Sequence, residues 1–357
     1  MSKLQSLILV GASAAFAMSA SYADPPTGVT VQDLGVGPGG TAAYATGLNN
    51  RGQVIGLGDE STPGLYPGIL WYSGLTVDLP FLSATDVESA PISINDAGRI
   101  AGYSDAGCYS CALTEADVWH DGVVALIPLP YGYTGGNAWG INSRGQIVGG
   151  AAVSQATRNL GRAFVSFGGV ATVLEPLPGY AKSTGLAINN PGAVVGVSIS
   201  ADSSIIRATL WSKDKITDLG FLPGGDYSEP HSINAHGQIT GTATYPPLFN
   251  TVAVLWDNGK MINLGTLPGG TSSSDAFSGI TDSGIIVGTS DGTAAPLGHA
   301  VIWKCGKIID LGVLAGGTYS FATGINDRGE VVGGGDGAGF VNGEHALLWH
   351  TNALECK

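Results

Sequence analysis

The stretch Ile325-Asn326-Asp327-Arg328-Gly329-Glu330-Val331-Val332-Gly333 decides the fold, because related copies of it recur seven times along the chain. A glycine stands three residues after the Asn position in every copy, and a second glycine follows four residues later. A repeat of this length is typical of solenoids, propellers and other arrays. The copies follow one another at steps of 45 to 47 residues, with the Asn position filled by Asn49, Asn95, Asn142, Asn189, Asn234, Thr281 and Asn326.

Each copy predicts a β-hairpin. An aliphatic strand runs into Asn-x-x-Gly, and a short run of Val or Ile follows. Asn favours the start of a turn because its side chain can bond the backbone two residues on. Gly then adopts the left-handed conformation that closes a hairpin with a bulge. The alternative, an Asn array that binds metal ions, is disfavoured because calcium prefers loops richer in carboxylates.

Two further sequence motifs recur with the same period. One strand ends in Trp, as in His299 to Trp303 and His345 to Trp349, and an Asp-Leu pair such as Asp310-Leu311 follows after a short turn. The third copy has Ser166 at the Trp position, and we expect Phe167 to fill that space. No segment shows a helical apolar period over helical length. Four short strands per repeat therefore predict an all-β, seven-bladed β-propeller between Val31 and Trp349.

The same pattern predicts which strand is innermost and how the ring closes. Two residues before the Asn position only Gly, Ala or Ser occurs, as expected where seven strands converge on an axis. The last repeat lacks its fourth strand, while an extra strand, Thr30 to Leu34, precedes the first repeat. We expect this strand to pair beside His345 to Trp349 and to remove the open edge.

The chain begins with features of a secretory signal peptide. Lys3 precedes an apolar run, and Ser21-Tyr22-Ala23 resembles a cleavage site. We therefore expect residues 1–23 to be removed, and residues 24–357 to form one propeller domain that is secreted or periplasmic. No later stretch is long and apolar enough to span a bilayer.

The composition limits the classes of partner that the protein can bind. Glycine supplies 57 residues, charged residues only 12%, and the net charge is −13. This balance argues against nucleic acids and anionic membranes, because both need a basic surface. We expect a monomer without a cofactor.

In an exported protein the four cysteines become disulfide candidates. Cys108 and Cys111 form a Cys-x-x-Cys without the context of a redox or zinc site, and this favours a small loop bridge. Cys305 and Cys356 flank the predicted closure. A Cys305–Cys356 bridge would stabilise the fold by roughly 4 kcal/mol on the loop-entropy estimate, and peptide mapping without reductant tests it.

The chain resembles the HAF repeat family of extracellular bacterial proteins. The resemblance rests on Asp310-Leu311-Gly312, Gly324-Ile325-Asn326 and His345-Ala346, and it covers Val31 to Trp349. Val301 or Leu347 replaces the Phe of the family motif. The family implies export and a repeat fold, and it brings no catalytic residues with it. Kelch-like propellers, which also carry paired glycines and a Trp per blade, are the second resemblance.

No enzyme motif was found, so deviations from the repeat suggest where function lies. The fifth copy carries Asp226, Tyr227, Glu229 and His231 where other copies have Ser, Thr and Ala. Because strands alternate in direction, the tight hairpins gather at one end of the ring and the longer loops at the other. Variable loops on a rigid scaffold usually carry function, and aromatic side chains suit recognition. We therefore expect Tyr227, Glu229, His231, Trp139 and Tyr319 to bind a protein or glycan at the long-loop end.

The second hypothesis is a secreted hydrolase or lyase that acts on a polysaccharide or similar substrate. Its site would be formed by Asp226, Glu229 and His231, since a carboxylate with a histidine can perform general acid–base catalysis. Enzyme sites usually draw on several blades, whereas only one blade clearly departs from the pattern here. A binding role without catalysis and without a metal site is therefore favoured.

Overall fold

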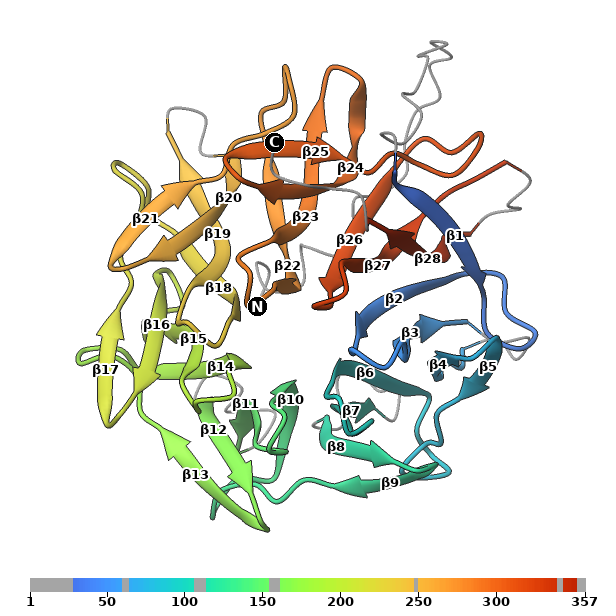
Figure 1. Cartoon of the computed structure of the whole chain (residues 1–357). Helices are drawn as coiled ribbons and strands as arrows, with labels where there is room; N and C mark the ends of the chain where they lie inside the picture. Colours follow the sequence, from blue (N-terminus) through green and yellow to red (C-terminus); the bar gives the residue numbers. More distant parts are fainter. Residues whose placement is uncertain are drawn as a thin grey trace.

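The computed structural model is a ring of seven β-sheet blades around a central axis (Figure 1). It describes residues 28–59, 64–105, 114–153, 161–246, 250–338 and 343–351. Within these ranges no helix is present, and so no helix is long and apolar enough to cross a membrane. The expected signal peptide, Cys108, Cys111 and Cys356 lie outside the described residues. The predicted all-β, seven-bladed propeller is confirmed.

Each blade runs from the axis outward in chain order, as predicted. The strands of blades 1 to 3 are β2 (Ala43–Leu48), β3 (Val54–Gly58), β4 (Gly68–Tyr72), β5 (Leu75–Asp78), β6 (Glu88–Ile94), β7 (Ile100–Asp105), β8 (Glu115–His120), β9 (Val123–Leu126), β10 (Gly135–Ile141), β11 (Ile147–Ala152), β12 (Arg162–Phe167) and β13 (Val170–Leu174). Those of blades 4 and 5 are β14 (Lys182–Ile188), β15 (Val194–Ile199), β16 (Ile206–Ser212), β17 (Lys215–Asp218), β18 (Ser228–Ile233), β19 (Ile239–Tyr245), β20 (Asn250–Asp257) and β21 (Lys260–Asn263). Those of blades 6 and 7 are β22 (Ser273–Ile280), β23 (Ile286–Gly292), β24 (Ala295–Lys304), β25 (Lys307–Asp310), β26 (Ser320–Ile325), β27 (Glu330–Gly335) and β28 (His345–His350).

The ring closes as the sequence predicted. Strand β1 (Thr30–Gly35) pairs antiparallel with β28 and becomes the outermost strand of blade 7. His345 on β28 contacts the Asp33 carboxylate on β1 at 2.9 Å. Blade 6 forms the equivalent contact within one continuous segment, between His299 and Asp310, also at 2.9 Å. The N-terminal strand therefore gives blade 7 the same His–Asp contact that blade 6 makes between two strands adjacent in sequence.

Two tight turns per blade lie at one end of the ring, which we call the short-hairpin end. One is the Asn-x-x-Gly turn, in which Gly98 has a φ of 81° and donates its amide to Asn95 O. The other joins the two outer strands, as at Asn258 and Gly259, whose φ values are 50° and 77°. Cys305 occupies the same turn position in blade 6. The connections between blades, and those between second and third strands, lie at the opposite end, the long-loop end.

The second glycine of the repeat makes room for the core. A Cβ on Gly102 would lie 1.9 Å from the Ala90 carbonyl oxygen and 3.0 Å from the Trp119 ring. Trp119 and Trp349 are among the largest fully buried side chains of the described residues. Glycine is therefore required wherever the aromatic ring crosses the second strand.

One core prediction was wrong. Phe164, not Phe167, fills the Trp space in blade 3, because Phe164 is fully buried and Phe167 is more than half exposed. Side chains alternate across a strand, so Phe164 shares the face of Ser166 and Phe167 points the other way. A Cβ on Gly149 would lie 3.0 Å from the Phe164 ring, as expected for the Trp substitute.

Candidate functional site

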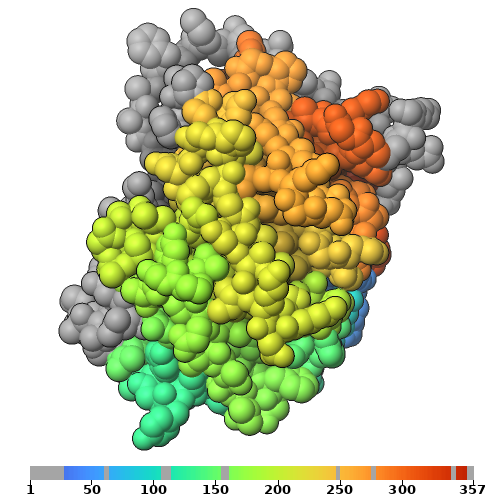
Figure 2. Space-filling model, turned by 90° about the vertical axis from the view of Figure 1, so that its left-hand side faces the viewer, coloured from blue at the N-terminus to red at the C-terminus, as the bar shows by residue number. Residues whose placement is uncertain are grey.

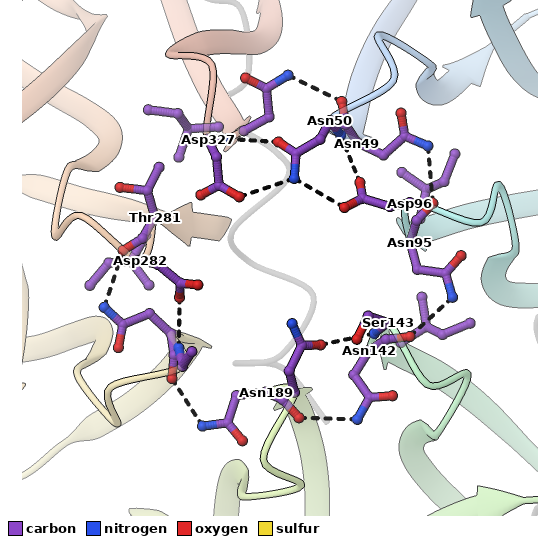
Figure 3. Close-up of a pocket in the computed structure, with 18 of the residues that line it drawn as sticks. Asn49, Asn50, Asn95, Asp96, Asn142, Ser143, Asn189, Thr281, Asp282 and Asp327 are labelled. Carbon is purple, nitrogen blue, oxygen red and sulfur yellow. Dashed lines mark hydrogen bonds between the residues drawn. The ribbon is translucent and has the colours of Figure 1, made fainter.

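A pocket of about 210 Å³ lies on the axis at the short-hairpin end (Figure 3). It is lined in every blade by the Asn-position residue, the aliphatic residue before it and the residue after it. These side chains come from the turn that leaves each innermost strand. The most regular part of the sequence therefore forms the axial mouth.

The Asn side chains link neighbouring blades, a role that the turn interpretation missed. Asn95 Oδ1 accepts the backbone N–H groups of Ala97 and Arg99 at 3.1 and 3.0 Å, which is the predicted turn chemistry. Its Nδ2 also donates to Asn142 O in the next blade at 3.0 Å. The same cross-blade bond starts from every Asn of the set, namely Asn49, Asn95, Asn142, Asn189, Asn234 and Asn326. Thr281 has no amide to donate, so this ring of bonds is interrupted between blades 6 and 7.

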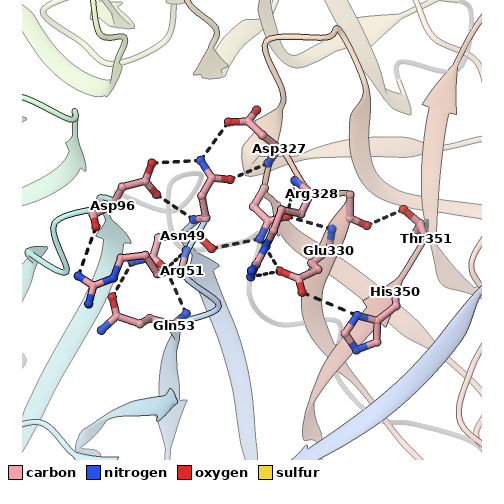
Figure 4. A network of polar contacts seen from close by, with 12 residues as sticks. Asn49, Arg51, Gln53, Asp96, Asp327, Arg328, Glu330, His350 and Thr351 are labelled. Carbon is pink, nitrogen blue, oxygen red and sulfur yellow. Dashed lines mark hydrogen bonds and ion pairs between the residues drawn. The ribbon is translucent and has the colours of Figure 1, made fainter. Parts of the chain in front are cut away.

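The charged side chains around this mouth have polar partners (Figure 4). The Asn50 Nδ2 lies 3.1 Å from an Asp96 oxygen and 3.0 Å from an Asp327 oxygen. Arg328 forms an ion pair with Glu330 at 2.5 Å. In the described part of the chain no three His, Cys, Asp or Glu side chains are grouped to hold a metal ion. The polar groups of the short-hairpin end are thus largely used to hold the blades together.

The five predicted binding residues all lie on innermost strands or directly before them. Tyr227 directly precedes β18, and Glu229 and His231 lie on that strand. Trp139 lies on β10 of blade 3, and Tyr319 directly precedes β26 of blade 7. Tyr227 and Tyr319 lie seven residues before the Asn position and Glu229 lies five before it, whereas His231 and Trp139 lie only three before it. The five residues therefore come from three blades and from different depths along the innermost strands.

Blade 5 brings two of these residues into direct contact. The Tyr227 hydroxyl donates a short hydrogen bond to the buried Glu229 carboxylate. His231 is buried and lies at a β-bulge between Pro230 and Ser232. At the same bulge in blade 1, the Thr46 hydroxyl donates to a carbonyl of blade 2 at 2.7 Å. The bulge position therefore faces the neighbouring blade.

Asp226 has a structural partner, which weakens the hydrolase hypothesis. In blade 1 the Asp59 carboxylate closes a loop by accepting the Thr41 hydroxyl and backbone N–H. Blade 5 has the same clamp with the residue types exchanged: Thr244 donates its hydroxyl to Asp226 and accepts the Asp226 N–H, both at 3.0 Å. The hydrogen bonds of Asp226 thus serve its own loop.

Blade 7 holds a second pair of phenol and carboxylate. The Tyr319 hydroxyl donates to Glu344 at 2.8 Å, and burial followed by this bond raises the pKa of Tyr319. Tyr44 of blade 1 packs edge-on against Phe321, with ring centroids 6.2 Å apart. Burial, together with the charges of Glu88 and Glu344, raises the pKa of Tyr44 to about 12. Tyr44 therefore lies in the negative field of carboxylates from both neighbouring blades.

Blade 2 holds the third pair, which sequence reasoning missed. The Tyr103 hydroxyl lies 3.4 Å from a Glu88 oxygen, and the Tyr103 ring lies 6.1 Å from the Trp139 ring. Burial, and then the nearby Asp105 charge, raise the pKa of Glu88. Glu88 and Tyr103 stand 15 residues apart on separate strands, and the repeat gives no signal that they meet.

We call this set the tyrosine–glutamate girdle; it comprises Tyr44, Glu88, Tyr103, Trp139, Tyr227, Glu229, Tyr319 and Glu344. Trp139 and Tyr227 pack against one hydrophobic cluster around Leu186 and Val197, which connects blades 3 and 5. Phenol hydroxyls can donate and accept hydrogen bonds, and carboxylates can accept them. The aromatic rings can also contact cations through their faces. The girdle thus offers several recognition groups from different blades.

The charges of the chain are divided between the two ends. Nine of the twelve described Lys and Arg residues lie in or beside the turns of the short-hairpin end: Arg51, Arg99, Arg144, Lys213, Lys215, Lys260, Lys304, Lys307 and Arg328. At the long-loop end the described cations are Arg162, Lys182 and Arg207. The carboxylates of the loops and strand starts there are Asp59, Asp86, Glu88, Asp105, Glu115, Asp202, Asp226, Glu229, Asp291, Asp336 and Glu344. The long-loop end therefore carries more carboxylates than cations, whereas the cations of the short-hairpin end are offset by carboxylates such as Asp96, Asp282 and Asp327.

Comparison with known proteins supports the fold alone. No family model matches the chain, and no curated protein matches its sequence. The β-propeller domain of the trilobed protease from Pyrococcus furiosus aligns with a TM-score of 0.55 at 10% identity, over 89% of this chain and 99% of that one. A prolyl endopeptidase gives 0.56 at 12% identity over 83% of this chain, and a puromycin-hydrolyzing peptidase from Mycobacterium tuberculosis gives 0.53 at 12% over 88%. The chain spans about half the length of these two peptidases, 46% and 52%.

Proposed function

We propose that this protein is an exported binding module without catalytic activity, and that its long-loop end recognises a protein or glycan through the tyrosine–glutamate girdle. The observation that carries the proposal is that blades 2, 5 and 7 each form a tyrosine–glutamate pair at the long-loop end. Export rests on the signal-peptide pattern and on the resemblance to the HAF repeat family.

The charge of this end favours ligands with cationic or hydrogen-bond-donating groups. The charges that raise the pKa values of Tyr44, Glu88 and Tyr319 are all carboxylates. A ligand ammonium or guanidinium group would relieve this repulsion and form charge-assisted hydrogen bonds. We therefore expect a basic protein segment or an amine-bearing glycan to bind more tightly than a neutral or acidic one.

The experiment is a glycan array together with a panel of basic, neutral and acidic peptides, applied to the mature protein. Glu88→Gln combined with Glu344→Gln should weaken binding of the best ligand at least tenfold, because it removes two girdle charges and preserves side-chain size. Tyr227→Ala combined with Tyr319→Ala should also weaken it. The matched control, Lys213→Ala with Lys260→Ala, changes exposed charges at the short-hairpin end and should leave affinity unchanged.

Two results would contradict the proposal. One is loss of binding in the control but not in the girdle variants, which would place the site at the short-hairpin end. The other is turnover of a substrate in a hydrolase panel that disappears on Glu229→Gln, which would favour the hydrolase hypothesis.

A further inference from the structure

The outermost strands of the blades fall into two classes. Among the described strands, β5, β9, β13, β17, β21 and β25 are each the outer edge of their sheet. In blades 4 to 6 the first residue of this strand is an exposed lysine: Lys215, Lys260 or Lys307. In blades 1 to 3 the same position holds Leu75, Val123 or Val170, each about two thirds exposed, at 66%, 66% and 67%. The rim of blades 4 and 5 faces the reader in Figure 2.

The lysines have a general physical role at such an edge. A free edge strand presents unpaired backbone N–H and C=O groups that can template pairing with another chain, and a charged side chain opposes this. The edge strands of blades 4 to 6 therefore begin with a lysine that opposes pairing with another chain, and those of blades 1 to 3 begin with an apolar residue. An apolar edge without this charge is suited to accept an added strand.

Blade 1 combines this edge with an adjacent hollow. Val77 on β5 pairs directly with Leu70 on β4, and Leu75 pairs with Tyr72, so these four side chains share one face of the sheet. Leu75 and Val77 are exposed by 66% and 50%, and Tyr72 by 40%. Leu70 also lines a hollow of about 150 Å³ between blades 1 and 2.

The hollow has an apolar floor and a polar rim. Leu70, Leu79, Ile100 and Trp119 line it, and Arg51 and Asp121 lie at its edge. A strand added to β5 places alternate side chains on the face that carries Leu70. One of these side chains can enter the hollow as an apolar anchor, a common arrangement in strand addition.

We propose that the β5 edge of blade 1 is a docking site for an extended, apolar segment of another protein, which adds as a fifth antiparallel strand and anchors one side chain in this hollow. A second copy of this chain is a poorer occupant, because each copy carries a net charge of −13 and two copies repel each other. A partner segment with flanking basic residues would instead be attracted.

The probe is a fluorescein-labelled ten-residue peptide in which Val and Thr alternate around a central Leu, with a Lys at each end. Its control is the same peptide N-methylated at alternate backbone amides, which keeps charge and side chains but removes the donors for pairing. We expect saturable binding of the first peptide in a fluorescence polarisation titration and at least tenfold weaker binding of the second. Hydrogen exchange should show slowed amides on β5.

Reciprocal variants locate the site. Leu75→Lys with Val77→Thr converts β5 from Leu-Thr-Val-Asp to a close match of β17, Lys-Ile-Thr-Asp, and should weaken binding at least tenfold. Lys215→Leu with Thr217→Val makes the opposite change on β17 and should create a second, weaker site. Both changes lie on exposed or half-buried positions, and circular dichroism confirms that the variants fold.

Three outcomes would overturn the proposal. Equal affinity for the methylated peptide would show that backbone pairing is not involved. Unchanged binding by the β5 variant, with loss on Val123→Lys or Val170→Lys, would place the site on another blade. Dimerisation of the wild type in analytical ultracentrifugation that the β5 variant abolishes would make a second copy the occupant.

Discussion

The two ends of this propeller use the same repeat in different ways. At the short-hairpin end, six blades make the same cross-blade bond from an Asn side chain to the next turn. At the long-loop end, the blades differ: some close a loop with an Asp clamp, blade 5 exchanges the two residue types, and three blades add a tyrosine–glutamate pair. The comparison teaches that the repeated residues build the ring, and that the residues which vary between blades gather at the end to which we assign the proposed binding.

The largest expected effect comes from opening the ring. Deleting residues 24–35 removes β1 together with the contact between Asp33 and His345. Both ends should lose order, because the cross-blade bonds at one end and the girdle at the other need neighbouring blades in place. We expect the melting temperature to drop by at least about 10 °C. Each kcal/mol lost lowers the melting temperature of a large domain by about 2–4 °C, and opening the ring should cost several kcal/mol. A protein that melts like the full chain in calorimetry would show that closure contributes little.

The second prediction compares one polar residue from each end. Asn95→Ala removes two partly buried contacts to turn N–H groups and the buried bond to Asn142, and it leaves backbone groups unpaired. We expect a loss of about 2–4 kcal/mol in the free energy of unfolding. Asp59→Ala removes contacts to Thr41 and Ala42 that are largely exposed, so about 1 kcal/mol should be lost.

Urea unfolding monitored by tryptophan fluorescence measures both variants. The pH dependence of Asp59 provides a further check. Burial opposes ionisation of Asp59, but hydrogen bonds from Thr41 and Ala42 outweigh it and lower its pKa below 3.8. Its contribution is therefore present above about pH 4 and lost as the pH falls further. A larger cost for Asp59→Ala than for Asn95→Ala at pH 7 would reverse the comparison between the two ends.

Much of this architecture was predictable because it is periodic. Blade number, strand order and closure follow from repeat positions, such as those of Asn326 and Trp349, that are filled by the same residue type at nearly constant steps. The same reasoning failed where partners lie on different strands or blades. The bond from Asn95 to Asn142 joins residues 47 apart, and the contact between Glu88 and Tyr103 depends on strand register. Adjacency to Ser166 favours Phe167, whereas the two-residue alternation of a strand places Phe164 on the face of Ser166.

The third prediction concerns a core position at which blades 2 and 4 differ. Asp117 is fully buried, accepts the Ser104 hydroxyl with one oxygen, and has no hydrogen-bond partner for the other among the described residues. Burial raises its pKa to about 7. In blade 4 the equivalent pair is neutral: Thr209 donates to Ser198 at 2.9 Å.

Asp117→Thr imports the blade 4 pair into blade 2. Because the folded pKa is raised above the unfolded value of 3.8, Asp117 favours folding most below about pH 4, and this advantage is lost as the pH rises through 7. The groups that face it are Ser104, Glu115 and Asp86, and the last two keep their carboxylates in the variant. We expect Asp117→Thr to be more stable than the wild type by about 1–2 kcal/mol at pH 8, and less so at pH 5. Equal pH profiles in urea titrations would refute the assignment.

The smallest expected effect, and a gain, comes from completing the ring of Asn bonds. Thr281 stands at the Asn position of blade 6, where its hydroxyl accepts the Ile285 N–H at 3.1 Å and reproduces only the turn contact. At this seam the two innermost strands instead share a parallel backbone contact between Ser278 and Gly324. Thr281→Asn should keep the turn contact and add a donor toward Asn326 O, with a gain of about 1 kcal/mol. Asn326→Thr is the matched control: it keeps a turn acceptor but loses the bond to Asn49 O at 3.1 Å, and it should cost about as much as the first variant gains. If Thr281→Asn leaves the unfolding midpoint unchanged while Asn326→Thr lowers it, the parallel contact already holds blades 6 and 7 together, and the missing Asn is compensated by backbone pairing.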